Sequence, residues 1–431
     1  MNKEKKLVPK LRFPEFVNEG EWDVEPFSEV YSFYGTNSFT RDNLNYSDGD
    51  VKNIHYGDIH TKFRTHFDIQ KETVPFVNSD ISIEKIKEDS FCKEGDMIYA
   101  DASEDLNDIG KSIEIINTNK ERILSGLHTL LARQKTNKMS IGFGGHLFKS
   151  PSIRTQIQKE AQGAKVLGIS ATRLSNIIVY YPRNKSEQQK IASCLSSLDE
   201  LIAAHTDKLE AMKDHKKGLM QQLFPAEGET VPKLRFKEFE KDGEWVEKNI
   251  ASIGNVITGG TPSKNDNEFW DGDFVWITAQ DFKDKYIFNS VLKLTQKGKN
   301  KSRKIPKDSV LVTCIASIGL NAINKVECAT NQQINAIVCN VDNYFEFVYY
   351  AIEFNKIRLK SLAGQTAVPI INKTVFEGFE IMIPKKKVEQ QKIANFLSSI
   401  DDEITAQTQK IEGLKEHKKG LMQGLFPVVN E

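Results

Sequence analysis

Residues 187–225 read EQQKIASCLSSLDELIAAHTDKLEAMKDHKKGLMQQLFP, and the chain contains this stretch twice. It returns at residues 389–427 as EQQKIANFLSSIDDEITAQTQKIEGLKEHKKGLMQGLFP, at a constant offset of 202 residues and with 26 of 39 positions identical. A repeat of this length indicates that the chain is built from two equivalent halves, so every other feature has to be interpreted against it.

Each copy carries a heptad pattern, which is typical of a long helix that packs against another helix. Polar residues occupy two seam positions per copy, His205 and Lys216 in the first and Gln407 and Lys418 in the second. Neither copy has an internal Pro, and each ends in Leu-Phe-Pro, where Pro stops the helix. The predicted apolar seam consists of Ile191, Leu195, Leu198, Ile202, Leu209, Met212, Leu219 and Leu223, and of Ile393, Leu397, Ile400, Ile404, Ile411, Leu414, Leu421 and Leu425.

The seam allows two arrangements. Each helix could pack on its own domain, or the two helices could pack on each other. Matching polar positions at the same phase favour the second arrangement. Antiparallel pairing is expected, because a globular segment follows the first helix and must return the chain.

A shorter repeat defines the rest of the organisation. Residues 8–22, VPKLRFPEFVNEGEW, recur at 231–245 as VPKLRFKEFEKDGEW, at an offset of 223. The chain is therefore an opening motif, a variable segment and a long helix, followed by all three again. We expect a globular domain at 1–182, a spacer helix at 183–225, a second domain at 226–384 and a second spacer helix at 385–431.

Both variable segments have a mixed α/β pattern with little residue-level identity between them. A turn into a buried strand is expected at 95–100, further strands at 112–116, 275–277, 310–315 and 335–341, and helices at 151–165 and 345–362. Each segment closes with an apolar run before Pro, at 177–181 and at 379–383. The predicted fold is therefore two α/β domains separated by two long antiparallel coiled-coil helices, with an internal pseudo-twofold repeat.

Composition narrows the classes of function. The 431 residues suffice for two or three domains with real cores. With 59 basic and 59 acidic residues the formal charge is zero, so no global field drives binding to nucleic acid. The polar start and the lack of a long apolar stretch predict neither a signal peptide nor a membrane span. The five Cys form no Cys-x-x-Cys pair, which indicates reduced thiols in a cytoplasmic protein rather than disulfides or a zinc site.

Three local clusters could contact nucleic acid. The fifteen residues 293–307 hold seven cations and no acid, which suits phosphate neutralisation or an ordinary solvated loop. Residues 55–66 place Tyr56 and three His among Lys62 and Arg64, side chains that bond phosphates and base edges. Residues 330–333, Thr-Asn-Gln-Gln, offer amides that suit adenine, although a polar turn explains them as well.

No catalytic motif is found. A DNA amino-methyltransferase needs an Asn/Asp-Pro-Pro-aromatic turn, and the sequence has no Pro-Pro pair. Gly110-Lys111-Ser112 resembles the end of a phosphate loop, but Asp105 stands where that motif requires Gly. Glu-x-Lys, as in metal nucleases, occurs only at 4–6 and inside the second long helix. The acidic cluster Asp101, Glu104 and Asp105 is better explained as a loop cap than as a metal site, so we expect neither catalytic nor metal-binding residues.

The whole chain resembles the specificity subunit of type I restriction–modification enzymes. The resemblance rests on the doubled PKLRF-x-EF…GEW motif, the doubled EQQKIA helix ending HKKGLMQ-x-LFP, and the two dissimilar segments between them. Further support comes from Gly-Gly-Thr-Pro at 259–262, Phe-Trp at 269–270 and Trp-Ile-Thr at 276–278, and in the first segment from residues 53–59 and 95–98.

The resemblance implies a non-catalytic subunit with two target-recognition domains, each reading one half of a split, asymmetric site on double-stranded DNA. The paired helices would set the unread gap and, with the opening motifs, dock two methyltransferase subunits. These subunits would bind S-adenosylmethionine and modify adenine, and motor–nuclease subunits would bring ATP and Mg²⁺. No cofactor and no membrane contact are expected for this chain itself.

The residues expected to contact DNA are Tyr56, His60, Lys62 and Arg64 in the first domain, and Ser263, Lys264, Thr278, Gln280, Lys299, Lys301, Arg303, Gln332 and Gln333 in the second. Two other hypotheses stay open. One is an enzyme with an unrecognised site, and the other is a scaffold whose variable segments bind something other than DNA.

Overall fold

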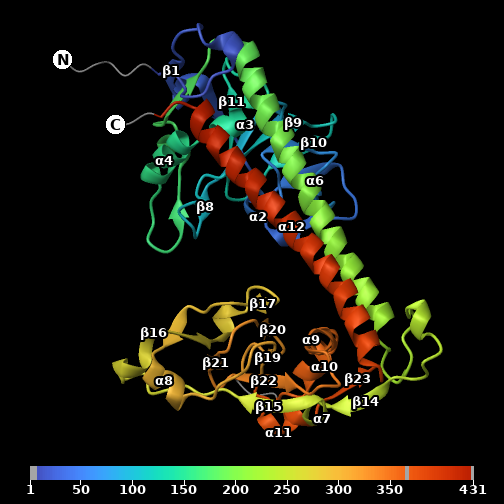
Figure 1. The fold of residues 1–431 in the computed structure, drawn as a ribbon. Coiled ribbons are helices and arrows are strands. Elements are labelled where there is room, and N and C mark those ends of the chain that lie inside the picture. Colours follow the sequence, from blue (N-terminus) through green and yellow to red (C-terminus); the bar gives the residue numbers. More distant parts are fainter. Residues whose placement is uncertain (1–6, 365–367, 429–431) are drawn as a thin grey trace. The chain divides into compact units, whose positions relative to one another are not determined.

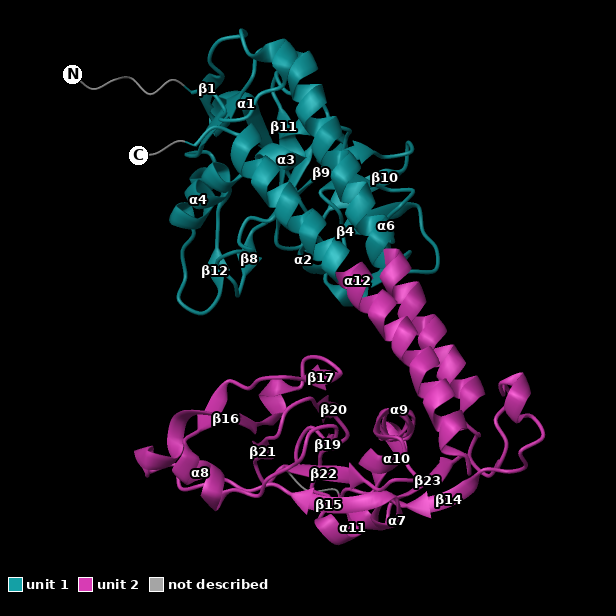
Figure 2. Cartoon of the chain, in the orientation of Figure 1, with its two compact units in different colours: residues 1–206, 409–431 teal, residues 207–408 magenta. Residues whose placement is uncertain are grey.

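The computed structural model describes residues 7–364 and 368–428, which form two compact units (Figure 2). Unit 1 comprises residues 1–206 and 409–431, and unit 2 comprises residues 207–408. These units cut through both long helices, whereas the domains expected from the sequence follow the repeats. The division at 182, 225 and 384 therefore stays a prediction.

Unit 1 contains a five-stranded sheet and a four-stranded sheet. The order of the larger sheet is β2 (Tyr31–Tyr34), β11 (Thr129–Gln134), β7 (Met97–Ala100), β9 (Ser112–Asn117) and β5 (His66–Asp68). The order of the smaller sheet is β10 (Arg122–Ser125), β4 (Val51–Ile54), β6 (Phe76–Val77) and β3 (Leu44–Asn45). Its helices are α1 (Phe27–Val30), α2 (Tyr56–Thr61), α3 (Phe143–Leu147), α4 (Pro151–Glu160) and α5 (Ala171–Leu174).

Unit 2 repeats this topology. Its five-stranded sheet has the order β15 (Gly254–Thr258), β22 (Ile334–Cys339), β19 (Val310–Thr313), β20 (Asn321–Asn324) and β17 (Tyr286–Ile287). Its second sheet has the order β18 (Leu292–Leu294), β16 (Trp270–Ile277) and β21 (Ala329–Thr330). Its shorter helices are α7 (Ile250–Ile253), α8 (Gln296–Lys301), α9 (Phe345–Phe354), α10 (Lys356–Ser361) and α11 (Lys373–Glu377). The matching order shows a common fold beneath the divergent sequences.

A small antiparallel sheet closes each variable segment. In unit 1, β1 (Asp23–Pro26) pairs with β13 (Ile178–Tyr181), and in unit 2, β14 (Val246–Asn249) pairs with β23 (Glu380–Ile383). The apolar runs before Pro are thus strands, and each returns the chain to the residues that follow its opening motif.

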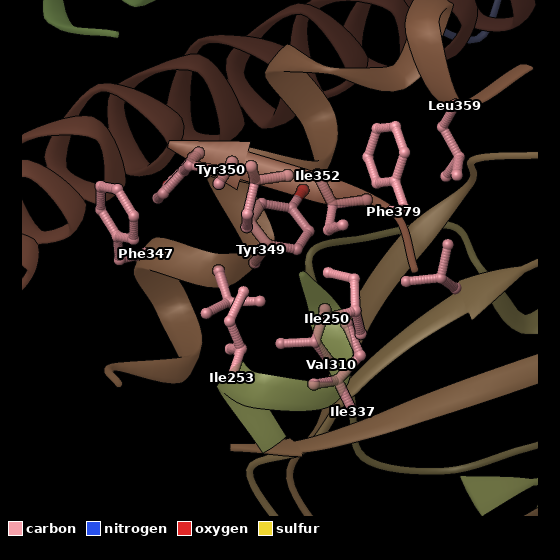
Figure 3. Packing of buried hydrophobic residues seen from close by; sticks show 14 of the residues in the cluster. Ile250, Ile253, Val310, Ile337, Phe347, Tyr349, Tyr350, Ile352, Leu359 and Phe379 are labelled. Carbon is pink, nitrogen blue, oxygen red and sulfur yellow. The ribbon is translucent and has the colours of Figure 1, made fainter. Parts of the chain in front are cut away.

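Both units have extended apolar cores. In unit 2, Ile250 and Ile253 of α7 pack with Phe347 of α9 and with Val310 and Ile337 of the sheet (Figure 3). All five side chains are buried, so the apolar residues of these short strands and helices form the core of the unit.

The two repeats form 39-residue helices, α6 (Lys185–Leu223) and α12 (Lys387–Leu425) (Figure 1). In unit 1 the beginning of α6 packs against the end of α12, where Asp199 pairs with Lys418 and Leu195 shares a core with Met422. In unit 2 the equivalent ion pair joins Lys216 to Asp401 at 2.5 Å. The prediction that the helices pair antiparallel is therefore confirmed within each unit, and every predicted seam residue is buried or half-buried.

Several predicted boundaries were wrong. The helix expected at 151–165 ends at Glu160, because the backbone is already extended at Ala161, with φ −68° and ψ 144°. The helix expected at 345–362 divides into α9 and α10 at Asn355, whose side-chain amide donates to the Ala351 carbonyl at 2.8 Å and competes with the backbone ladder. The strand expected at 310–315 ends at Thr313, and the one expected at 335–341 ends at Cys339. Within the described ranges, no helix has the length and apolarity to cross a membrane.

Candidate nucleic-acid interface

Four loops of unit 2 surround a pocket of about 530 Å³. They are the loop after β15, the loop after β16, the loop after β19 and the turn between β21 and β22. Polar side chains from all four loops line the pocket: Thr261, Lys264, Thr278, Gln280, Ser317, Asn331, Gln332 and Gln333. A polar rim over a stable sheet is the arrangement expected of a surface that reads hydrogen-bonding groups.

The loop after β15 is held firmly by aromatic and cationic side chains. The Trp276 indole N–H donates to the Gly260 carbonyl at 3.2 Å, and the Trp270 indole donates to the Ser263 carbonyl at 3.0 Å. Arg303 donates to the Thr258 carbonyl at 2.8 Å. These bonds fix the loop before any ligand arrives, which reduces the entropy that binding must remove.

Close backbone approach explains the first glycine of the Gly-Gly-Thr-Pro motif. A Cβ on Gly259 would lie 2.1 Å from the Asn331 carbonyl oxygen, so only glycine fits there. A Cβ on Gly260 would meet nothing within 4 Å, although its N–H donates to the Thr330 carbonyl at 2.8 Å. The loop after β15 and the β21–β22 turn are therefore packed backbone to backbone.

Internal bonds orient the amides of the β21–β22 turn. Thr261 Oγ1 donates to Gln332 Oε1 at 2.6 Å, and Asn331 Nδ2 donates to Gln333 Oε1 at 3.0 Å. Both glutamine oxygens are thus engaged within the protein, and both amide nitrogens retain donors. A bidentate pairing with adenine would need oxygen and nitrogen together.

Unit 1 places loops at the same topological positions. Ser125 of β10 pairs in parallel with Ile54 of β4, as Thr330 of β21 pairs with Ile277 of β16. The Asn37 N–H donates to the Ser125 carbonyl at 3.1 Å, the counterpart of the bond from Gly260 to Thr330. The loops after β2, β4 and β10 in unit 1 therefore correspond to those after β15, β16 and β21 in unit 2.

An ion-pair network supports the unit 1 loops. Arg41 binds both carboxylate oxygens of Asp58 at 2.8 Å, and Lys62 lies 3.1 Å from the same group. Burial alone would raise the pKa of Asp58, but hydrogen bonds from Arg41 and Lys62 outweigh it and leave the pKa below its ordinary value. Asp58 is thus a fixed anion that positions two cations near the loop after β4.

An aromatic and histidine cluster covers this network. The Tyr56 ring centroid lies 4.7 Å from that of His55 and 5.3 Å from that of His128. His128 Nδ1 lies 3.2 Å from Asp101 Oδ1, and burial raises the pKa of Asp101 while His128 opposes the shift. His55 accepts from the Gly57 N–H at 3.1 Å, and burial followed by the nearby Arg41 charge lowers its pKa.

A second pocket, of about 550 Å³, belongs to unit 1 and lies between its five-stranded sheet and the start of α6. At its base, Ser196 Oγ lies 3.0 Å from His66 Nδ1 and 3.1 Å from His146 Nε2. Burial lowers the pKa of His146 well below its ordinary value and lowers that of Lys149 to about 7. Arg64 and Lys71 line the same pocket, opposite Asp199 and Glu200.

An arginine clasp joins each opening motif to a long helix. Arg12 binds both oxygens of Glu187, at 2.7 and 2.8 Å, and donates to the Gly20 carbonyl at 2.6 Å. In unit 2, Arg235 binds Glu389 at 2.8 and 2.9 Å and donates to the Gly243 carbonyl at 2.6 Å.

Neighbouring contacts of the clasp are duplicated as well. Lys190 lies 3.3 Å from Glu15, and Lys392 lies 3.4 Å from Glu238. The Leu11 N–H donates to the Gly424 carbonyl and the Leu234 N–H to the Gln222 carbonyl, both at 2.9 Å. These contacts of the opening motifs with the long helices, together called the frame, thus recur in both units, while the loops around the sheets differ.

Comparison with known proteins agrees with this arrangement. Residues 242–416 match the family profile of the type I restriction modification DNA specificity domain. A putative type I restriction enzyme MjaX specificity subunit of Methanocaldococcus jannaschii is 28% identical over 80% of this chain and 81% of its own length. The HindI specificity subunit of Haemophilus influenzae is 33% identical over 39% of this chain and 38% of its own.

Solved structures share the fold across nearly the full length. The S subunit of a type I restriction–modification system from M. genitalium aligns with a TM-score of 0.60 at 14% identity, covering 98% of this chain and all of that one. Residues 242–416 thus match the type I restriction modification DNA specificity domain, and the chain is similar to a putative type I specificity subunit over most of its length.

Most residues nominated in the second domain of the chain gather at one pocket. Lys264, Thr278, Gln280, Gln332 and Gln333 line it. Ser263 lies next to Lys264, and its carbonyl accepts from Trp270. The structure brings these residues together from three loops, and their contact with DNA stays a prediction.

The lysine-rich segment has mainly internal contacts. Lys299 lies 2.6 Å from Glu327 and its ammonium sits 4.4 Å from the Phe274 ring centroid, while Arg303 holds the loop after β15. Lys301 is exposed at the end of α8. The structure thus gives Lys299 and Arg303 supporting roles and leaves Lys301 open to solvent.

The residues nominated in the first domain are distributed over two places. Tyr56, His60 and Lys62 belong to α2 or its C-terminal end, but His60 Nε2 lies 3.0 Å from the Ala102 carbonyl and faces the protein. Arg64 is exposed at the second pocket. Sequence reasoning missed Arg41 and His128, which reach the cluster through strand pairings that no local motif reveals.

Proposed function

We propose that each recognition domain of the chain reads one half of a split, asymmetric DNA site. The observation that carries the proposal is the contrast between a frame whose ion pairs recur in both units and topologically equivalent loops with different side chains. Equivalent loops present Arg41, Tyr56 and His128 in unit 1 but Lys264 and Gln333 in unit 2. Because different donors and acceptors bind different base edges, the two half-sites should differ in sequence.

The paired helices are proposed to set the length of the unread gap. At about 1.5 Å per residue, each 39-residue helix is roughly 58 Å long. Half-sites read by a two-part protein commonly lie about 34 Å apart, or one helical turn of DNA. A helix of this length is thus of the right scale for the task.

The repeated frame is proposed to dock two methyltransferase subunits, one on each copy. Val8 and Leu11 of the first opening motif are 38% and 46% exposed, and their counterparts Val231 and Leu234 are 44% and 42% exposed. Apolar side chains exposed at the same repeated positions suit two copies of one protein partner.

The chemistry is proposed to reside in the partners. Methyltransferase subunits would bind S-adenosylmethionine and methylate adenine, and motor–nuclease subunits would use ATP and Mg²⁺ for restriction. We place the assembly in the cytoplasm, where its DNA substrate is found.

A methylation map tests the proposal. The chain is expressed with its methyltransferase partner in a host that lacks other adenine modification, and host DNA is sequenced with detection of modified bases. A bipartite motif with a fixed gap and methyladenine in each half is expected. Methylation without a motif, or a stable complex without methylation, would favour a scaffold. Modification or cleavage by the purified chain alone would establish an enzyme instead.

A further inference from the structure

The turn between β10 and β11 of unit 1 occupies the place of the Asn331–Gln333 turn in unit 2. Ser125 ends β10 and Thr129 begins β11, and Thr330 and Ile334 do the same in β21 and β22. Both turns therefore contain three residues, and His128 stands at the position of Gln333. Both β11 and β22 run second in the order of their five-stranded sheets, so the correspondence rests on pairing as well as on length.

His128 has a backbone conformation that L-residues rarely adopt. Its φ of +56° lies in the left-handed region, which is unfavourable for a residue other than glycine. Contacts on both sides maintain this conformation. The Asp101 N–H donates to the His128 carbonyl at 3.0 Å, and the Tyr56 ring meets the His128 ring edge-on at 5.3 Å.

The side chain of His128 is both fixed and accessible. It is 52% exposed, although its Nδ1 lies 3.2 Å from a carboxylate oxygen of Asp101. A carboxylate can only accept, so Nδ1 carries the proton and the neutral ring presents Nε2 as an acceptor. By contrast, Gln332 and Gln333 have their oxygens engaged and present donors.

We propose that His128 is a specificity-determining residue of unit 1, whose Nε2 accepts a hydrogen bond from the exocyclic amino group of an adenine or cytosine in the major groove. Both amino groups are major-groove donors, so an acceptor held at a fixed position recognises where in the groove the donor lies. This inference rests on the proposed function of unit 1 as a half-site reader. It names His128 as the contacting residue and Nε2 as the hydrogen-bond acceptor, neither of which the proposed function specifies.

The test uses the complex of the full chain with its methyltransferase subunits and the substitution His128→Gly. Glycine adopts a positive φ freely, so the variant removes the imidazole while relieving backbone strain, and misfolding is not expected to confound the result. Asn119→Gly is the matched control, because Asn119 also has a left-handed φ, of +49°, but lies in the β9–β10 turn, which precedes β10.

The first readout is a methylation map of wild type and both variants. His128→Gly is expected to make one position of one half-site degenerate, with at least a fivefold loss of discrimination there, while the other half and the gap are unchanged. Asn119→Gly is expected to retain the wild-type motif. An unchanged motif in His128→Gly, or a uniform loss on every sequence without change of base preference, overturns the proposal.

The second readout identifies the atom. At the degenerate position, adenine is replaced by nebularine or cytosine by its 4-deamino analogue, and binding is compared for wild type and His128→Gly. Removing the amino group should weaken binding of the wild type by about fivefold or more relative to its effect on His128→Gly, because the variant has no imidazole to contact that group. Coupling to a 7-deazapurine instead would overturn the assigned polarity. If the wild-type chain gives no bipartite motif at all, the proposed function itself is wrong. If the wild type gives such a motif and His128→Gly leaves it unchanged, only the role assigned to His128 is wrong.

Discussion

The five-stranded sheets of the two units have the same strand order, but the loops that follow their strands are stabilised by different interactions. In unit 2, indole N–H groups of Trp270 and Trp276 hold the loop after β15 through its carbonyls. In unit 1, the ion pair between Arg41 and Asp58 supports the equivalent region. The difference teaches that strand order depends on buried apolar positions and on the frame, while the loops can be stabilised by any chemistry that leaves the required side chains exposed.

Breaking the arginine clasp should have the largest effect. Arg12→Met leaves Glu187, whose side chain is 1% exposed, as an uncompensated buried charge, and should cost about 3–5 kcal/mol. The matched substitution Arg235→Met should cost somewhat less in unit 2, where Glu389 is equally buried but keeps a hydrogen bond from the Trp245 indole N–H at 3.2 Å. Hydrogen exchange followed by mass spectrometry would assign each loss to its unit. A loss below about 1 kcal/mol in either variant would contradict the equivalence of the two frames.

Filling the close approach at Gly259 should be the next largest effect and should concern unit 2 alone. Gly259→Ala places a methyl group 2.1 Å from the Asn331 oxygen, so the β21–β22 turn must move, at a cost of about 1–3 kcal/mol. Recognition of one half-site should weaken accordingly, as measured by competition between duplexes. Gly260→Ala is the control, because its methyl group meets nothing within 4 Å. Equal effects of the two substitutions would show that the close packing is unimportant.

Acid should destabilise unit 1 through its buried histidines. The folded pKa of His146 is depressed, so the unfolded chain takes up a proton first and stability falls as pH drops below about 6.5. The slope is about 1.4 kcal/mol per pH unit for each such histidine until the folded pKa is reached. Hydrogen exchange of α3 at pH 7.5 and pH 5.5 would measure it.

The histidine contribution is isolated by His146→Gln, which retains a hydrogen-bonding group for Ser196. Burial raises the pKa of Glu114 to about 7, which opposes the histidine effect because stability from Glu114 is lost as pH rises. The difference between wild type and variant removes this opposing contribution. Unit 2 has no buried histidine among its described residues, so its exchange provides an internal reference. A variant with the same acid slope as wild type would refute the assignment.

Releasing Gln332 should have the smallest effect. Thr261→Val removes the hydroxyl that holds Gln332 Oε1 and should cost about 1 kcal/mol, or roughly fivefold, in discrimination by unit 2. The amide could then turn its oxygen outward and accept as well as donate. Competition between duplexes altered at single positions would detect this broadening.

The parts of the fold that were predictable are those with a repeated or periodic signal. Both ends of α6 and the start of α12 lie within two residues of the expected bounds, because heptad spacing acts locally. The second helix was expected to run to residue 431, but α12 ends at Leu425, shortly before the terminal Pro. The kinship of the two sheets was not predictable, because it lies in strand pairing between segments with little common sequence. The interruption at Asn355 was missed for a related reason, since a single side-chain bond there outweighs an otherwise helical pattern.

The candidate site also contains residues that the sequence predicted and residues that it did not. Lys264, Thr278, Gln280, Gln332 and Gln333 were found because short polar motifs follow predicted strands. Arg41 and His128 were missed because their relevance depends on β10 pairing in parallel with β4, a contact between residues about seventy positions apart in the chain. The donor polarity of the glutamines also required the structure, since Thr261 is the residue that orients Gln332.

The composition of the units has a consequence for biosynthesis. Unit 2 is one continuous stretch, whereas unit 1 needs residues 409–431 in addition to its first 206 (Figure 2). A ribosome releases residues in order, so unit 2 has all its parts while unit 1 still lacks the end of α12. Until that end emerges, the surface around Trp22 that later packs on Phe426 stays uncovered. The half that is translated first is therefore the half that finishes folding last, and it is the one most dependent on protection during synthesis.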